Sequence, residues 1–113
     1  MEYAEEYDEQ CVAYIAKIEN AFMKSKKCSA AEGKRILKGI LGYIDDIKAV
    51  LIYYKSDLYL VPRAREAEFR AKYDSYLEKV QKYELLAKKM ELSLEKDYEG
   101  LRALKHSYDP SRV

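Results

Sequence analysis

The sequence contains few of the residues that break helices or build cofactor-binding loops. Its 113 residues include only four glycines and two prolines, whereas average usage would give about 12% of these two types together. Multi-turn β-sandwiches and glycine-rich phosphate loops need more of both, so we expect neither. Hydrophobic residues make up 49% of the chain and charged residues 36%. An all-α fold fits this composition.

Residues that carry metal-binding or nucleophilic chemistry are also scarce. Cys11 and Cys28 do not form a CxxC motif, and His106 is the only histidine. No serine, cysteine or carboxylate is arranged around that histidine as a catalytic partner. Adjacent acidic residues such as Asp45 and Asp46 point about 100° apart on a helix, so they do not share a metal or a proton. We predict no enzyme activity, no catalytic residue, no metal, no cofactor, and two reduced cysteines.

Neither one sign of charge nor a long apolar run dominates the chain. Lysine and arginine number 21 against 20 aspartates and glutamates, which gives a net charge of +1. This balance argues against a nucleic-acid partner held by net charge. No apolar run reaches the ~18 residues that span a bilayer, and the first residues are acidic where a signal peptide is basic. As the sequence stands, we expect a soluble, cytosolic chain.

Two helices are predicted in the first half of the chain from apolar residues at helical spacing. The first covers about residues 3–24, with acidic residues early and lysines late, an order that complements the helix macrodipole. The second begins at the capping sequence Ser-Ala-Ala-Glu of residues 29–32 and continues to about Leu58. Gly39 and Gly42 lie inside this second helix. Either a neighbouring helix approaches closely there, or the helix accommodates the ~1 kcal/mol cost of each glycine.

The third predicted helix opens with Pro62 near its first turn and is the longest. Its apolar residues alternate in steps of four and three, which is the seam of a coiled coil: Phe69, Tyr73, Tyr76, Val80, Tyr83, Ala87, Met90 and Leu94. A looser pattern continues through Leu104. Because the connections are short, we predict an antiparallel up-down-up three-helix bundle with left-handed, coiled-coil-like packing over residues 1–108, followed by a tail at 109–113.

Tyrosine is unusually frequent, with twelve copies and no tryptophan. Seven tyrosines fall on or beside the apolar stripes, where a ring packs at the margin of a core with its hydroxyl in water: Tyr7, Tyr14, Tyr43, Tyr54, Tyr73, Tyr76 and Tyr83. Tyr53 and Tyr59 do not follow the same stripe. We expect exposed aromatic surface near the second connection, either as part of a protein interface or as isolated exposed rings.

Basic residues gather at the other end of the second helix, around the first connection. They form a basic corner: Lys24, Lys26, Lys27, Lys34, Arg35 and Lys38. Such a corner can make weak contacts with anionic lipid headgroups or an acidic protein segment, or it can be a solvated surface without a ligand. Together with the aromatic end, it gives a candidate protein-interaction surface: Tyr53, Tyr59, Arg63, Lys34, Arg35 and Lys38.

The order of several short segments resembles a known family. An acidic opening with tyrosine is followed by a leucine-isoleucine pair, an aspartate-leucine pair and a proline-arginine junction, then by spaced Arg, Tyr and Leu. In this sequence they are Glu5–Gln10, Leu51-Ile52, Asp57-Leu58 and Pro62-Arg63, then Arg65, Arg70, Tyr73, Tyr76 and Leu77. Over roughly residues 6–94 the chain resembles the N-terminal domain of the Vti-family (Qb-type) vesicle-transport SNARE proteins.

The resemblance implies a non-catalytic three-helix domain that takes part in vesicle-mediated transport, intracellular protein transport and membrane fusion. It implies docking of other SNARE proteins and epsin-type adaptor domains on the cytosolic face of Golgi and endosomal membranes. Residues 109–113 would lead toward a SNARE motif and a C-terminal membrane anchor that this sequence does not contain. The isolated domain would be a monomer. The alternative is a self-associating structural coiled-coil protein, whose Phe69–Leu94 seam pairs with another copy.

Overall fold

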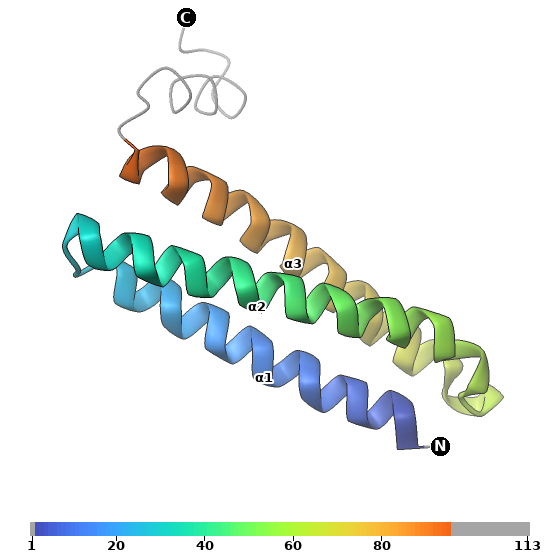
Figure 1. Cartoon of the computed structure of the whole chain (residues 1–113). Helices are drawn as coiled ribbons and strands as arrows, with labels where there is room; N and C mark the ends of the chain where they lie inside the picture. Colours follow the sequence, from blue (N-terminus) through green and yellow to red (C-terminus); the bar gives the residue numbers. More distant parts are fainter. Residues whose placement is uncertain (1, 96–113) are drawn as a thin grey trace, which may run out of the picture.

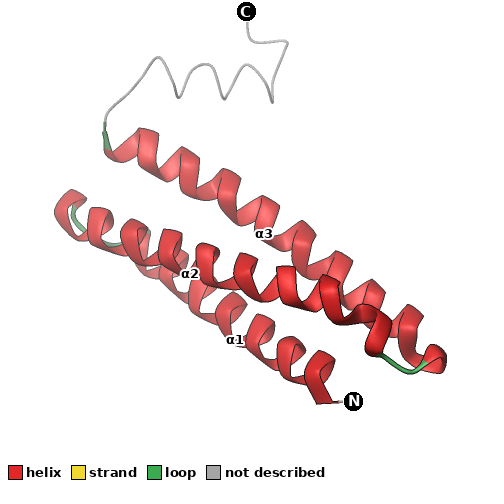
Figure 2. Cartoon of the chain, turned by 45° about the vertical axis from the view of Figure 1, so that its right-hand side comes forward, coloured by secondary structure: helices red, strands yellow, loops and turns green. Residues whose placement is uncertain are grey.

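The computed structural model of the protein describes residues 2–95, which form three α-helices (Figure 1). These are α1 (Glu2–Ser25), α2 (Ala30–Asp57) and α3 (Glu66–Leu94), with two 3₁₀ turns, Leu58–Leu60 and Arg63–Arg65, between α2 and α3. No strand occurs in this part of the chain, and every regular element in Figure 2 is helical. The all-α prediction is therefore confirmed. The expected continuation to residue 108 and the tail at 109–113 lie outside the described residues.

The helix ends follow local sequence signals. Ser29 caps α2, because its side-chain oxygen accepts a hydrogen bond from the backbone N–H of Glu32 at 3.2 Å. The predicted start of this helix is therefore confirmed. Pro62, in contrast, lies before α3 rather than in its first turn: the chain first makes the 3₁₀ turn Arg63–Arg65, and α3 begins at Glu66. Within the described residues α3 has 29 residues and α2 has 28.

The chain reverses direction at both connections, so α1 and α3 begin at the same end of the molecule (Figure 1). Side-chain pairs mark this arrangement. Tyr7, near the start of α1, binds Asp57 at the end of α2, and Lys48 of α2 pairs with Glu84 of α3. The backbone of α2 lies close to both neighbours, whereas α1 and α3 lie further apart and are joined by side chains such as Tyr76 and Tyr83 of α3. Thus α2 is the central helix.

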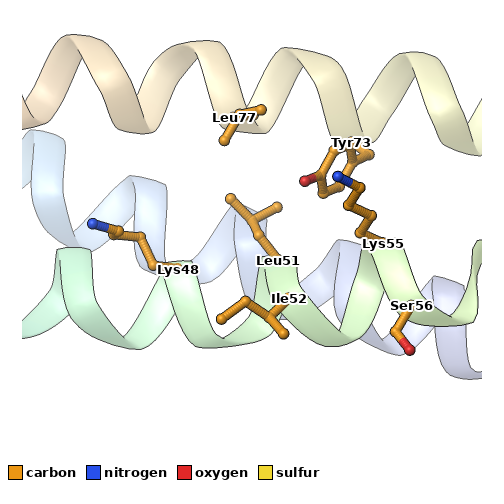
Figure 3. Close-up of a pocket in the computed structure, with 7 residues that line it drawn as sticks. All are labelled: Lys48, Leu51, Ile52, Lys55, Ser56, Tyr73 and Leu77. Atoms are coloured by element: carbon orange, nitrogen blue, oxygen red, sulfur yellow. The ribbon is translucent and has the colours of Figure 1, made fainter.

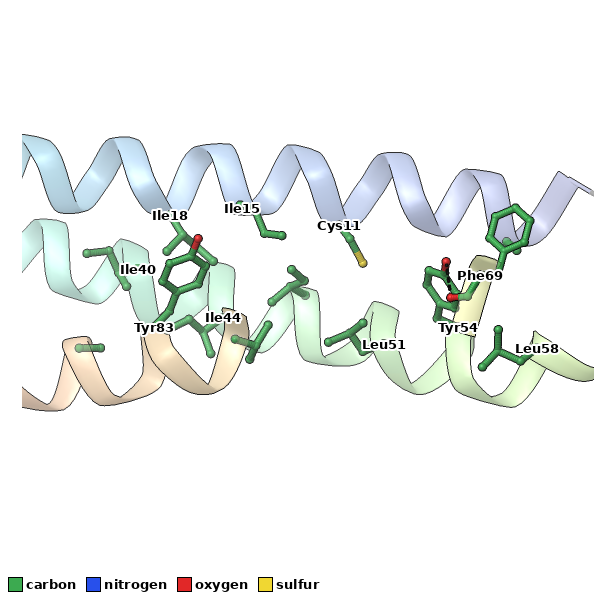
Figure 4. Packing of buried hydrophobic residues seen from close by; sticks show 14 of the residues in the cluster. Cys11, Ile15, Ile18, Ile40, Ile44, Leu51, Tyr54, Leu58, Phe69 and Tyr83 are labelled. Carbon is green, nitrogen blue, oxygen red and sulfur yellow. Dashed lines mark hydrogen bonds between the residues drawn. The ribbon is translucent and has the colours of Figure 1, made fainter. Parts of the chain in front are cut away.

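One cluster of buried side chains joins the three helices (Figure 4). The most completely buried large residues are Tyr54, Phe69, Ile18, Ile40, Ile47 and Val80. All eight positions of the four-three repeat in α3 are buried or half-buried, as the spacing predicted. The Phe69–Leu94 seam therefore packs within the chain itself, against the core residues of α1 and α2.

The glycines of α2 differ in their surroundings. A Cβ atom added at Gly39 or Gly42 would meet no other atom within 4 Å. Of the two alternatives for these positions, the close helix approach is wrong, because neither glycine has a neighbouring atom where a side chain would begin. The close approach occurs at Gly33 instead, where an added Cβ would lie 3.0 Å from Cδ2 of Leu94 and 3.5 Å from Sγ of Cys28. The end of α3 packs over this glycine.

Candidate docking groove

Tyrosine hydroxyls join the helices. The buried Tyr54 donates a hydrogen bond to the backbone carbonyl of Phe69 at 3.3 Å (Figure 4), and Tyr7 donates to Asp57 at 2.8 Å. Two further hydroxyls cross from α3 to α1, where Tyr76 donates to Asp8 and Tyr83 donates to Glu19. These four hydroxyls bind protein atoms rather than remaining in water, which corrects the sequence-based expectation.

Burial and the neighbouring carboxylates raise the pKa of the tyrosines that face α1. For Tyr76, burial is the largest cause and the hydrogen bond to Asp8 the second; for Tyr83, burial and then the hydrogen bond to Glu19 raise the pKa. The phenols therefore remain protonated donors at neutral pH. Two ion pairs also link this side to α1. Nη1 of Arg65 lies 2.9 Å from Oε1 of Glu5, and Nζ of Lys72 lies 3.8 Å from Oδ2 of Asp8.

On the other side of α3, a groove opens between α2 and α3 (Figure 3). Its volume is about 620 Å³, and it is lined by Lys48, Leu51, Ile52, Lys55, Ser56, Tyr73 and Leu77. Figure 3 shows Leu51 of α2 and Leu77 of α3 pointing toward each other, with Lys48 and Lys55 on either side of Leu51. Leu51 is 3% exposed and forms the floor, whereas Ile52 is 69% exposed on the rim. Apolar surface therefore remains open here.

A second, separate depression lies further along the same pair of helices. It has a volume of about 170 Å³ and is lined by Leu41, Ile44, Asp45, Glu84, Ala87, Lys88 and Glu91. An ion pair of 2.9 Å between Lys48 and Glu84 lies at the junction, because each partner lines one of the two depressions. We call the two depressions together the α2–α3 groove. From Leu41 to Ser56 it follows α2 for about 22 Å at ~1.5 Å per residue.

The six residues proposed from the sequence occupy two separate places. Tyr53 and Tyr59 are exposed, at 62% and 80%, on the last turns of α2 and in the following 3₁₀ turn, and Arg63 is exposed in the next 3₁₀ turn. The remaining three residues are exposed on the first turns of α2, at its opposite end: Lys34, Arg35 and Lys38. The structure does not bring the two groups together, and none of the six lines the α2–α3 groove.

The groove was not predicted from the sequence, because the predictions rested on the apolar residues that face the core and on the tyrosines outside that stripe. A signal was present in α2, where Leu41 and Ile52 are three helical turns apart and therefore share one side of the helix beside the core stripe. Both are exposed, at 42% and 69%. Large apolar residues on one exposed side of a helix often mark a binding surface.

The cysteines show little sign of chemical reactivity. Both are free thiols. Burial raises the pKa of the Cys11 thiol to about 12, so it is not ionised at neutral pH. The half-buried Cys28 donates its S–H to the carbonyl of Ser25 at 3.2 Å. Within residues 2–95, no three His, Cys, Asp or Glu side chains lie where they could hold a metal ion, and no helix is both long and apolar enough to cross a bilayer.

Fold and groove together define a class of protein: a chain that is all-helical over the described residues, with a groove between two helices that is lined by apolar and charged residues. Such a groove is the kind of surface that receives an amphipathic helix from another protein. Comparison of the chain with protein-family models, with curated proteins and with solved structures found no match.

Proposed function

We propose that this chain is a non-catalytic protein-interaction domain that binds a helix of a partner protein in the α2–α3 groove. The observation that carries this proposal is the open apolar surface of Ile52 and Leu77 above the buried Leu51, flanked by Lys48 and Lys55. Burial of apolar area supplies affinity, while the charges at the rim orient the partner.

The setting that we propose is vesicle trafficking, with the chain as the N-terminal domain of a Vti-family SNARE. It would dock epsin-type adaptor domains or other SNARE proteins and regulate SNARE assembly at Golgi or endosomal membranes. Two features support this setting: the order of short segments from Glu5 to Leu77, and the three helices that these segments form. The proposal includes an up-down-up bundle with left-handed, coiled-coil-like packing, which the four-three spacing in α3 favours.

The test is a binding titration of the full chain with a purified epsin-type adaptor domain and with purified SNARE proteins. We expect Ile52→Asp to weaken binding by at least about tenfold, because it places a charge on the apolar rim of the groove. Val12→Asp is the matched control, since Val12 is also exposed, at 54%, but lies on α1. The proposed groove is wrong if both variants weaken binding equally, and the proposed partners are wrong if none of them binds.

A second experiment tests the cellular setting. An antibody against the domain would report the size of the native protein and whether alkaline carbonate leaves it in the membrane pellet. A larger protein that stays in the pellet would support the SNARE setting. A species of 13.3 kDa in the supernatant would contradict it.

Self-association is the second candidate function, because several large apolar residues are exposed near the end of α2. They are Ile52, Tyr53, Tyr59 and Leu60, at 69%, 62%, 80% and 48%. Analytical ultracentrifugation separates the two candidates. A species of 13.3 kDa at all concentrations favours the docking domain, whereas a stable dimer favours the structural protein.

A further inference from the structure

The charges along the α2–α3 groove change from one end to the other. The depression near Ser56 is lined by two cations, Lys48 and Lys55, and by no anion. The depression near Leu41 is lined by Asp45, Glu84, Glu91 and one cation, Lys88, which pairs with Glu91 at 3.0 Å. A ligand that spans both depressions therefore meets positive charge first and negative charge afterwards.

The outer charges of this gradient are available to a ligand. Lys48 and Glu84 bind each other at the junction, and this hydrogen bond is the main reason that the pKa of Lys48 is raised. Lys55 and Asp45 form no ion pair with any of residues 2–95. They lie about 15 Å apart along α2 at ~1.5 Å per residue. A partner with the complementary order of charges would pair with both.

The order of charges in the groove and the macrodipole of the partner helix together favour one direction of binding. Acidic residues stabilise the N-terminal end of a helix and basic residues its C-terminal end, because of the macrodipole. We infer that the α2–α3 groove receives an amphipathic helix of another protein, acidic in its N-terminal half and basic in its C-terminal half. Its N-terminus lies beside Lys55 and its C-terminus beside Asp45, so it is parallel to α3 and antiparallel to α2. This inference rests on the proposed function of the groove.

Apolar residues line both depressions, so a bound helix must also present an apolar face. Leu51, Ile52 and Leu77 line one depression, and Leu41 and Ile44 line the other. A partner helix of about 15 residues, or four turns, covers the groove and presents apolar side chains at i, i+3, i+4 and i+7.

The test uses two stapled helical peptides of about 18 residues with the same composition and apolar stripe. The acid-first peptide carries glutamates in its N-terminal half and lysines in its C-terminal half, and the mixed peptide carries the same glutamates and lysines in alternation along its length. The staple keeps both peptides helical, so charge order is the only difference. We expect the full chain to bind the acid-first peptide at least about tenfold more tightly in fluorescence anisotropy.

Charge-swapped proteins show whether the groove sets the direction of the bound helix. In the unmodified chain, a spin label at the N-terminus of the acid-first peptide should broaden the methyl signals of Ile52 and Leu77 more than those of Leu41. Lys55→Glu/Asp45→Lys reverses the outer charges of the groove while keeping the net charge and the Lys48–Glu84 pair, and we expect the label then to broaden Leu41 the most. Lys38→Glu/Asp46→Lys is the matched control, because both residues are exposed on α2 and outside the groove, and it should leave the direction unchanged.

The outcomes separate this inference from the proposed function. If both peptides bind, Ile52→Asp weakens both, and the groove swap changes nothing, the charge order and direction are wrong while groove docking stands. If Ile52→Asp affects neither peptide, or if neither peptide binds, the groove is not the docking site and both proposals fall. If the chain dimerises and the groove swap abolishes the dimer, the occupant is a second copy and the inference is overturned.

Discussion

The two sides of α3 show how similar residue types can serve different purposes. On the side toward α1, Tyr76 and Tyr83 donate hydrogen bonds to Asp8 and Glu19, so polar groups are satisfied within the chain. On the side toward the outer face of α2, Tyr73 and Leu77 line an open groove. The first side holds the helices together, whereas the second leaves apolar surface and charge exposed.

The largest expected effect on stability comes from placing a charge on the side of α3 that faces α1. We expect Tyr76→Asp to destabilise the fold by about 3 to 5 kcal/mol, because a second carboxylate would face Asp8 in a partly buried position. Thermal unfolding followed by circular dichroism measures this loss, and the exposed Gln81→Asp is the control. Unchanged helicity and melting temperature in Tyr76→Asp would show that the assigned seam is wrong.

Removal of a single tyrosine hydroxyl on the side of α3 that faces α1 should have a smaller effect on stability. Tyr76→Phe and Tyr83→Phe each remove one donor to a carboxylate but keep the ring in place. We expect each to lower the free energy of unfolding by about 1 to 2 kcal/mol in urea titrations. Tyr53→Phe, at an exposed position, should have no effect. Equal losses at all three positions would contradict a specific role for the cross-helix bonds.

Alanine substitutions at the glycines of α2 test which of these positions pack against α3 and which are open. Gly39→Ala and Gly42→Ala should each raise the free energy of unfolding by about 0.5 to 1 kcal/mol, because both sites are open and alanine favours a helix. Gly33→Ala should give less or no gain, since the new Cβ would displace Leu94. If all three variants gain equally in chemical denaturation, the packing of α3 over Gly33 is wrong.

Stability in alkaline solution should depend on two buried groups whose pKa values are raised. Burial raises the pKa of Cys11 from 9.0 to about 12 and also raises that of Tyr54. The folded state therefore holds these protons where the unfolded state has lost them, so the free energy of unfolding should fall as pH rises from about 9 to 12. Between pH 7 and 8 it should not change from this cause. Urea titrations across this range measure the effect, and a rise in stability above pH 9 would contradict it.

A charge at the rim of the groove should have the smallest effect on stability. We expect Ile52→Asp to change the free energy of unfolding by no more than about 0.5 kcal/mol, because this side chain is 69% exposed. The same variant should weaken binding strongly. A large loss of stability would instead show that Ile52 belongs to the core.

Helix positions could be predicted from the sequence because they depend on local signals. The cap at Ser29 and the four-three repeat of α3 are visible in short segments, and both were correct. Tyr76 and Asp8 are 68 residues apart, and periodicity shows which face a residue occupies but not which partner it meets. For the same reason the packing of Leu94 over Gly33 was missed.

The groove could not be predicted because it belongs to two helices at once. Ile52 and Leu77 come from different helices, and neither sequence segment alone shows that a gap remains between them. The exposed Tyr53 and Tyr59 were correctly placed outside the core. Their role in binding a partner stays a prediction.

The most direct test of the central claim is methyl NMR of the full chain during titration with the acid-first peptide. We predict that the methyl signals of Leu51, Ile52 and Leu77 shift with saturable dependence on peptide concentration, while those of Ile15 and Ile18 in α1 do not move. Shifts confined to α1, or no saturable shift at Ile52 and Leu77, would contradict a docking groove between α2 and α3.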